Sequence, residues 1–134
     1  MKITERKIIE WFLRIAISTG LLSAVADRFG LWNKELSAWG NWEQFIEYTQ
    51  KLNPWVPSDF IQIVGGLETF LEIVFAIALL THLKTFLLAK GTGFLLLAFG
   101  ISMALFLNIK APFDYSVFKG SAAAFALSYM TKKQ

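Results

Sequence analysis

The sequence predicts an all-α fold: an integral membrane four-helix bundle of up-down-up-down order, with an amphipathic interfacial helix between the first two spans. Hydrophobic residues make up 55% of the 134 residues, a high share for a soluble domain. They gather in four long segments, at about residues 8–26, 60–80, 86–109 and 113–130. Because short links join the last three segments, consecutive helices are expected to be antiparallel neighbours. Residues 1–134 are therefore predicted to form a single membrane domain.

The first segment, residues 8–26, follows a basic N-terminal flank and in this respect is similar to a secretory signal peptide. It contains Arg14, exceeds the usual length of a signal-peptide core, and is followed by no clear cleavage site. We therefore expect it to be retained as the first spanning helix. Residues 60–80 and 86–109 are each long enough to cross a hydrocarbon core of about 30 Å as a helix.

The fourth segment, residues 113–130, carries the weakest signal. It is short, and the ammonium group of Lys119 must reach an interface to stay in water. Residues 122–127 are nevertheless uninterrupted, apolar and rich in small side chains. Four spans are the prediction, and three spans plus a re-entrant segment are the alternative.

The long connection between the first two segments, residues 30–57, is predicted to contain a helix at about residues 41–52. Its apolar side chains recur at helical spacing, and Asn41 with Gln44 three residues later resembles a capping box. The helix is expected to lie on the outer face of the membrane, either as an anchor alone or as a lid over a cavity. Four of the five tryptophans lie in this connection, as expected for rings at a headgroup boundary: Trp32, Trp39, Trp42 and Trp55.

The net charge of +3 is not that of a nucleic-acid binder, because the basic residues are dispersed at segment ends and form no stripe. The expected partner is the lipid bilayer, whose cytoplasmic side is the side richer in lysine and arginine. Both termini are therefore expected in the cytoplasm, with the chain in the cytoplasmic (inner) membrane of a bacterium. The two sides hold seven and five basic residues: Lys2, Arg6, Lys7, Lys84, Lys90, Lys132 and Lys133 against Arg28, Lys34, Lys51, Lys110 and Lys119.

Cysteine is absent from the sequence, which removes disulfides, thiolate metal sites and iron–sulfur clusters. The single histidine, His82, cannot supply bis-histidine haem ligation, and Met103 is expected to be a core residue rather than an axial ligand. No cluster has metal-ligand spacing. We therefore expect no haem, iron–sulfur or metal site, and electrons for any redox reaction would come from a partner or a bound cofactor such as a quinone.

Three charged residues inside apolar segments form the candidate ligand or proton site: Arg14, Glu68 and Glu72. Charged side chains at membrane depth are costly, and they face a partner or a cavity. Arg14 lies roughly 9 Å and Glu72 roughly 12 Å from the inner membrane face, which predicts an ion pair between them. Glu68, at roughly 18 Å and without an obvious cation, is expected to be the protonated carboxyl that contacts a ligand. The alternative is an ion pair that only fixes the helix register.

Two more charged residues, Asp27 and Arg28, follow the first segment at its outer end. They are candidates for the outer mouth of the bundle. The simpler interpretation is that they form a local charge pair with each other.

Several stretches carry a resemblance to a known family. Residues 11–32 (WFLRIAISTGLLSAVADRFGLW) and 65–80 (GGLETFLEIVFAIALL), with a later PFDYSVF before a short alanine-rich helix, resemble the DoxX-like family of small four-span membrane proteins. The resemblance covers essentially the whole chain. It implies that Arg14 stands for the family's arginine early in the first helix, and that Glu72 or Glu68 is its second-helix glutamate. It also places Arg28 where many members carry lysine.

This resemblance also implies a function. Some members of the family are subunits of thiosulfate:quinone oxidoreductase, and others accompany sulfur- or redox-stress enzymes. The leading hypothesis is a quinone-facing membrane subunit that partners another membrane or peripheral oxidoreductase subunit, with Arg14 and the two glutamates shaping the site. The alternative is a non-catalytic accessory or assembly subunit of a larger membrane complex. A transporter is disfavoured, because four spans without inverted repeats leave little moving machinery.

Overall fold

The computed structural model describes residues 2–133, with side chains from Thr4 onward; Met1, Gln134 and the side chains of Lys2 and Ile3 lie outside this range. The described chain contains helices, turns and loops but no strand, which confirms the prediction of an all-α fold. The helices are α1 (Lys2–Arg28), α2 (Trp42–Leu52), the 3₁₀ helix η1 (Ser58–Phe60), α3 (Ile61–Leu79), α4 (Thr85–Phe106), α5 (Ala111–Asp114) and α6 (Val117–Met130).

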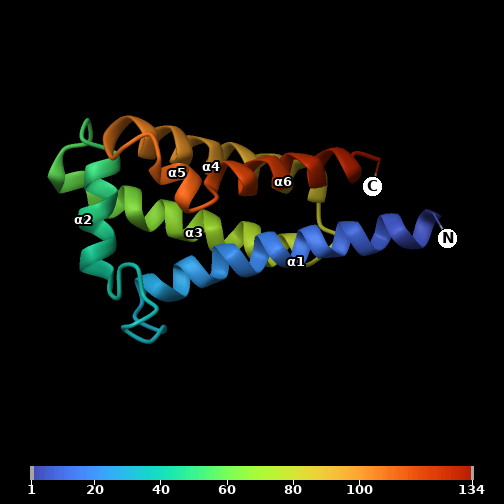
Figure 1. The fold of residues 1–134 in the computed structure, drawn as a ribbon, viewed down its shortest axis with the longest axis horizontal. Coiled ribbons are helices and arrows are strands. Elements are labelled where there is room, and N and C mark those ends of the chain that lie inside the picture. The colour runs from blue at the N-terminus through green and yellow to red at the C-terminus, as the bar shows by residue number, and fades with distance from the viewer. Residues whose placement is uncertain (1, 134) are drawn as a thin grey trace.

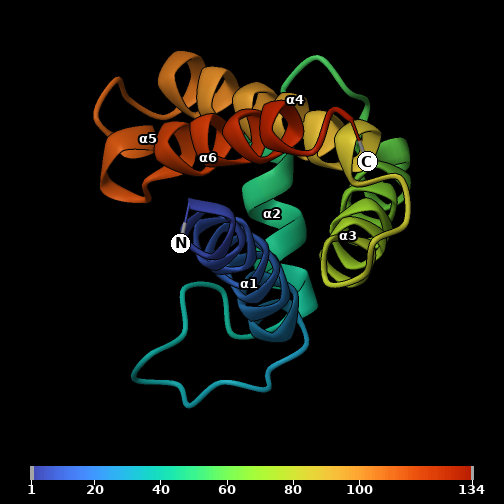
Figure 2. The same cartoon turned by 90° about the vertical axis from the view of Figure 1, so that its right-hand side faces the viewer.

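Four helices, α1, α3, α4 and α6, lie along the long axis of the molecule (Figure 1). Each runs opposite to the one before it, so the two ends of the chain lie at the same end of the molecule. Seen along this axis (Figure 2), α3 lies between α1 and α4, and α6 lies beside α4. Contacts between α6 and α1 complete the ring. The short helix α2 crosses the opposite end and contacts α1, α3 and α4.

Helix α2 forms over the predicted residues and closes one end of the bundle. The side chain of Asn41 accepts a hydrogen bond from the backbone N–H of Gln44 at 2.9 Å, the N-cap that the sequence predicted. The buried face of the helix includes Phe45 and Ile46, which pack against α3. Gly65 of α3 permits this approach, because a Cβ atom there would lie 2.5 Å from Cδ1 of Ile46.

Three helical segments are long and apolar enough to cross a membrane: Thr4–Arg28, Ser58–Leu79 and Thr85–Phe106. They correspond to the first three predicted segments. The fourth predicted segment, residues 113–130, is divided between α5 and the 14 residues of α6. A helix of that length measures about 21 Å, which is shorter than a hydrocarbon core of about 30 Å.

The outward and inward faces of α3 differ in polarity. Its exposed side is a stripe of large apolar side chains at helical spacing: Ile63, Leu67, Phe70, Val74 and Ile77. Its buried side carries Thr69 and Glu72 among small and apolar residues. A surface helix of a soluble protein shows the reverse arrangement, with its polar face outward.

The core at the end that holds the two chain ends is a cluster contributed by α1, α3, α4 and α6. Its members are Ile17, Leu21, Ala76, Leu79, Ala89, Ala124 and Leu127. Met103 belongs to a separate cluster with Leu52 of α2 and Ala111, as the sequence predicted for a core methionine. The helix ring therefore packs tightly at one end and depends on α2 for its closure at the other.

Candidate functional site

A cavity of about 470 Å³ lies inside the helix ring, in the half beneath α2. Residues of α1, α2, α3, α4 and α6 line it, and most of its wall is apolar. Three charged side chains reach it: Arg28, Glu68 and Glu72. Aromatic rings make up much of the remaining wall, namely Trp39, Phe45, Tyr48, Phe99 and Tyr115.

Arg28 is the last residue of α1, and its side chain turns into the bundle, where it is only 2% exposed. Its Nη1 atom lies 2.5 Å from Oε2 of Glu72 and donates a hydrogen bond to Oγ1 of Thr69 at 2.8 Å. The ring of Phe45 lies under the guanidinium at 4.0 Å from its centroid. Arg28 thus joins α1 to α3 and to the lid helix α2.

The guanidinium of Arg28 is only partly satisfied by these contacts. It carries five N–H bonds, and the hydrogen bond and ion pair both involve Nη1. Its Nε atom is buried and has no hydrogen-bond partner among the described residues. A buried donor without an acceptor is costly, and either a water molecule or a ligand oxygen can supply the acceptor.

Glu68 and Glu72 occupy neighbouring turns of α3 on the cavity wall. Glu72 is buried and paired with Arg28, whereas Glu68 is half-buried and forms no hydrogen bond or ion pair with any described residue. Tyr48 of α2 adds a second polar group. Its burial, together with neighbouring Tyr115, raises the pKa of Tyr48 to about 12, so the phenol keeps its proton at neutral pH.

Asp27 holds the loop that follows α1. Its carboxylate accepts a hydrogen bond from the hydroxyl of Ser37 and from the backbone N–H groups of Ala38, Trp39 and Gly40. The prediction of a local charge pair between Asp27 and Arg28 is therefore wrong, because the two side chains contact different residues. Asp27 acts on the site indirectly: it fixes Trp39, whose ring lies 5.4 Å from the guanidinium of Arg28.

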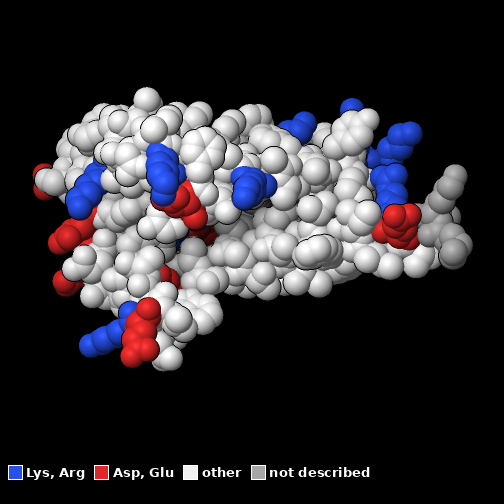
Figure 3. All heavy atoms as spheres, viewed as in Figure 1, with Lys and Arg blue, Asp and Glu red and all other residues white. Residues whose placement is uncertain are grey.

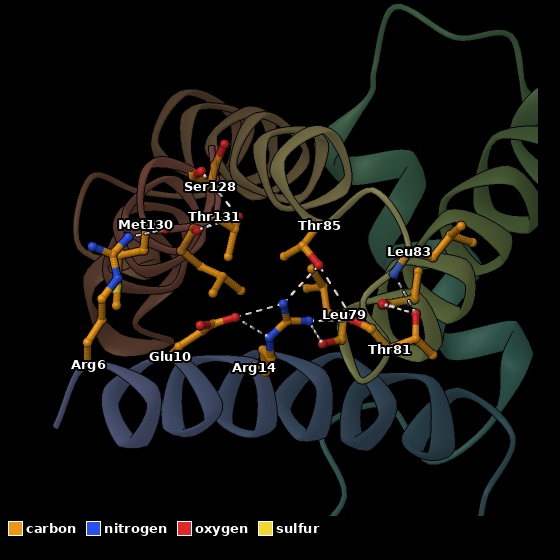
Figure 4. A network of polar contacts seen from close by, with 12 residues as sticks. Arg6, Glu10, Arg14, Leu79, Thr81, Leu83, Thr85, Ser128, Met130 and Thr131 are labelled. Carbon is orange, nitrogen blue, oxygen red and sulfur yellow. Dashed lines mark hydrogen bonds and ion pairs between the residues drawn. The ribbon is translucent and has the colours of Figure 1, made fainter. Parts of the chain in front are cut away.

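Arg14 lies outside the cavity, in a second polar cluster near the two chain ends (Figure 4). Its Nη2 atom pairs with Oε1 of Glu10 at 2.9 Å and donates to Oγ1 of Thr85. Its Nη1 atom donates to the backbone carbonyls of Leu79 and Thr81 at 2.7 and 2.5 Å. These carbonyls belong to the end of α3 and the turn after it, so Arg14 caps a helix C-terminus.

The predicted ion pair between Arg14 and Glu72 is therefore wrong. Glu72 pairs with Arg28 instead, and Arg14 pairs with Glu10. The structure brings Arg28, Glu68 and Glu72 together in one cavity and separates Arg14 from them. A signal for Arg28 was present in the sequence, because Leu21, Val25 and Arg28 continue the three- and four-residue spacing of the buried face of α1.

The site can bind a molecule with an oxygen acceptor at Arg28 and an apolar body against the aromatic wall. Among the described residues, no group of three or more histidine, aspartate or glutamate side chains is placed to hold a metal ion. Comparison of the chain with protein-family models, with curated proteins and with solved structures finds no match.

Proposed function

We propose that this chain is an integral membrane protein of the DoxX-like type that binds a quinone in the cavity beside Arg28, as the quinone-facing subunit of an oxidoreductase. The observation that carries the proposal is the buried guanidinium of Arg28, which lines a mostly apolar cavity and has N–H groups without a partner among the described residues. A quinone supplies carbonyl acceptors, a flat ring and reversible two-electron chemistry. The protein supplies the pocket, and the electrons come from a partner.

Membrane insertion is supported by the distribution of polarity. The exposed stripe of α3 is apolar and its charge is inward, which is typical of a helix in lipid. On the face shown in Figure 3, the side formed by α1 is uncharged between groups of charged side chains at the two ends. We propose that α1, α3 and α4 span the bilayer, and that α6 is a fourth, short span or a re-entrant helix. The end of the molecule that holds both termini is the side richer in lysine and arginine, so we place it in the cytoplasm.

A neutral acceptor suits the cavity better than an anion. Glu72 already neutralises Arg28, and Glu68 adds a second carboxyl to the same wall. A carboxylate or phosphate would add a second negative charge to a cation that Glu72 already neutralises, whereas a quinone carbonyl accepts a hydrogen bond without adding charge. The volume of about 470 Å³ lies within the range of about 300–1,000 Å³ that is usual for ligand pockets.

The proposed topology predicts opposite accessibility for the lid helix and the C-terminal end. The chain has no cysteine, so Gln44→Cys and Lys133→Cys each introduce a single thiol. In oriented membrane vesicles, a membrane-impermeant maleimide should label Gln44→Cys only from the outer side and Lys133→Cys only from the cytoplasmic side. Labelling of both thiols from one side would contradict the topology.

Quinone binding should depend on the hydrogen-bonding groups of the cavity. Arg28→Lys keeps a cation for Glu72 but loses the Nε and second Nη donors, so we expect affinity to fall about tenfold. Glu68→Gln should retain much of the binding, because an amide can still donate, whereas Glu68→Leu should not. Quenching of tryptophan fluorescence by added quinone measures this, since Trp39 lines the cavity.

Two controls complete this test. Glu47→Gln changes an exposed acid on the outer side of α2 and should leave affinity unchanged. Trp39→Phe should remove most of the quenching while quinone still binds in equilibrium dialysis. If the purified wild-type protein neither retains nor binds a quinone, the quinone proposal fails and the accessory-subunit alternative is favoured.

A further inference from the structure

We propose that the cavity is reached sideways, between α1 and α6, and that its ligand is a membrane-resident molecule with a long apolar chain. The head of the ligand lies at Arg28, and the chain lies along the opening and continues into the lipid. This inference rests on the proposed function and adds the route and the class of ligand: a tailed molecule rather than a soluble one.

The cavity is closed toward both ends of the bundle. At the outer end, α2 covers it with Phe45, Thr49 and Leu52, all of which line the cavity and are buried. Toward the other end its floor is formed by Ile17 and Leu21, which belong to the tightly packed core cluster. A ligand therefore has no direct path along the bundle axis.

The exposed residues of the cavity wall mark where it opens. On α1 these are Ala16 and Gly20, and on the other side they are Tyr115 and Ser116, which lead into α6; the one other exposed residue among the described residues of the wall is Ala38, in the loop after α1. Small side chains at Ala16, Gly20 and Ala24 repeat every four residues, so they share one face of α1. A Cβ atom added at Gly20 would meet nothing within 4 Å, so this part of the wall is open space.

The α1 edge of this opening is formed by small apolar residues. Exposed Phe12 lies one turn before Ala16 and faces lipid if α1 spans the bilayer, whereas exposed Lys119 lies one turn after Ser116 at the other edge. An opening at this depth is reached through the hydrocarbon core, in which an apolar chain gains from lying. At the inner end of the path lies the guanidinium of Arg28, on which the proposed function also rests. One molecule that carries both features is an amphiphile with an oxygen-bearing head and an apolar tail.

Two classes of ligand have an oxygen-bearing head and an apolar tail: long-chain quinones and lipids with a carboxyl head. The electrostatics of the cavity favour the quinone. Competition by oleate against a long-chain quinone distinguishes the two classes.

The test blocks the opening and compares tailed with tailless ligands. Gly20→Phe places a ring in the opening, and Gly66→Phe is the matched control, because Gly66 is also helical, does not line the cavity and has nothing within 4 Å of an added Cβ. In lipid nanodiscs, Gly20→Phe should weaken a long-chain ubiquinone about tenfold or more. The tailless ring analogue should bind Gly20→Phe as it binds wild type. Gly66→Phe should bind both ligands normally.

Each of the other outcomes shows which of the two proposals, the opening or the quinone site, is wrong. If Gly20→Phe weakens the two ligands equally, the tail does not lie in the opening, and if it affects neither ligand, the sideways opening itself is wrong; the quinone site stands in both cases. If oleate binds and the quinone does not, and Gly20→Phe weakens oleate, the opening stands and the proposed function fails. If wild type binds none of the three ligands, both are overturned. Ala16→Phe, one turn away on the same face, should repeat the Gly20→Phe result.

Discussion

Arg28→Leu should destabilise the protein by about 3–5 kcal/mol, because it leaves the carboxylate of Glu72 buried without its cation. Glu72 is only 3% exposed, and Arg28 is its ion-pair partner at 2.5 Å. The substitution also removes the donor to Thr69 and the cation over the ring of Phe45. The free energy of unfolding in mixed detergent micelles, titrated with a denaturing detergent, measures the loss.

A second substitution identifies the partner. Glu72→Leu added to Arg28→Leu removes both charges, and it should restore much of the stability, since a buried ion pair contributes little over an apolar pair of similar volume. Glu10→Leu added to Arg28→Leu is the control and should restore nothing, because Glu10 pairs with Arg14. If the Arg28→Leu Glu72→Leu protein is as unstable as the sum of the two single variants, the two residues are not coupled.

The helical elements were largely readable from the sequence. The apolar runs predicted α1, α3 and α4, and the spacing of Asn41 and Gln44 predicted the start of α2. These features are local: hydrophobic period and capping depend on residues within a few positions of each other. The helices near the C-terminal end of the chain were harder to predict. Ser116 adopts a left-handed backbone conformation with φ of 56°, which separates α5 from α6 inside one apolar segment.

The partners in the ion pairs could not be predicted from the sequence, because pairing depends on how far neighbouring helices are shifted along their axes relative to one another. Counting residues from the ends of apolar runs placed Arg14 and Glu72 at one level. Helix α1 continues past its apolar run to Arg28, and side chains on a helix lean toward its N-terminus. In antiparallel α1 and α3, Arg28 and Glu72 lean toward each other, whereas Arg14 and Glu72 lean apart. The same tilt carries Arg14 to the carbonyls at the end of α3.

The cavity could not be predicted from any single segment, because its wall is built from residues that are far apart in the sequence. The lining residues come from five helices and from the loop fixed by Asp27. A lid over a bundle cavity was one of two roles foreseen for residues 41–52, and the buried positions of Phe45 and Thr49 on the cavity wall agree with a lid. Tyr48 and Trp39 join the site only because α2 crosses the bundle at this end.

Arg14→Leu should also lower the free energy of unfolding by about 3–5 kcal/mol. The reason is different, and a different second substitution should restore part of the stability. Arg14 is fully buried, and it holds Glu10 together with two backbone carbonyls at the end of α3. Its loss removes the ion pair to Glu10 and two hydrogen bonds to backbone carbonyls at once. Arg6→Leu is the matched control, because Arg6 makes the same kind of contact to the carbonyl of Met130 from an exposed position. It should change stability by less than about 0.5 kcal/mol.

Rescue of Arg14→Leu should be partial and should come only from Glu10. Glu10→Leu removes the carboxylate that pairs with Arg14, but the carbonyl of Leu79 still lacks its donor and that of Thr81 keeps only the long hydrogen bond from Oγ1 of Thr85 at 3.5 Å, so about 1–3 kcal/mol should remain lost. Glu72→Leu added to Arg14→Leu should make the protein less stable still, because it strands the buried guanidinium of Arg28. Full recovery with Glu72→Leu would instead mean that Arg14 and Glu72 are partners, and the assignment of the two arginines would have to be exchanged.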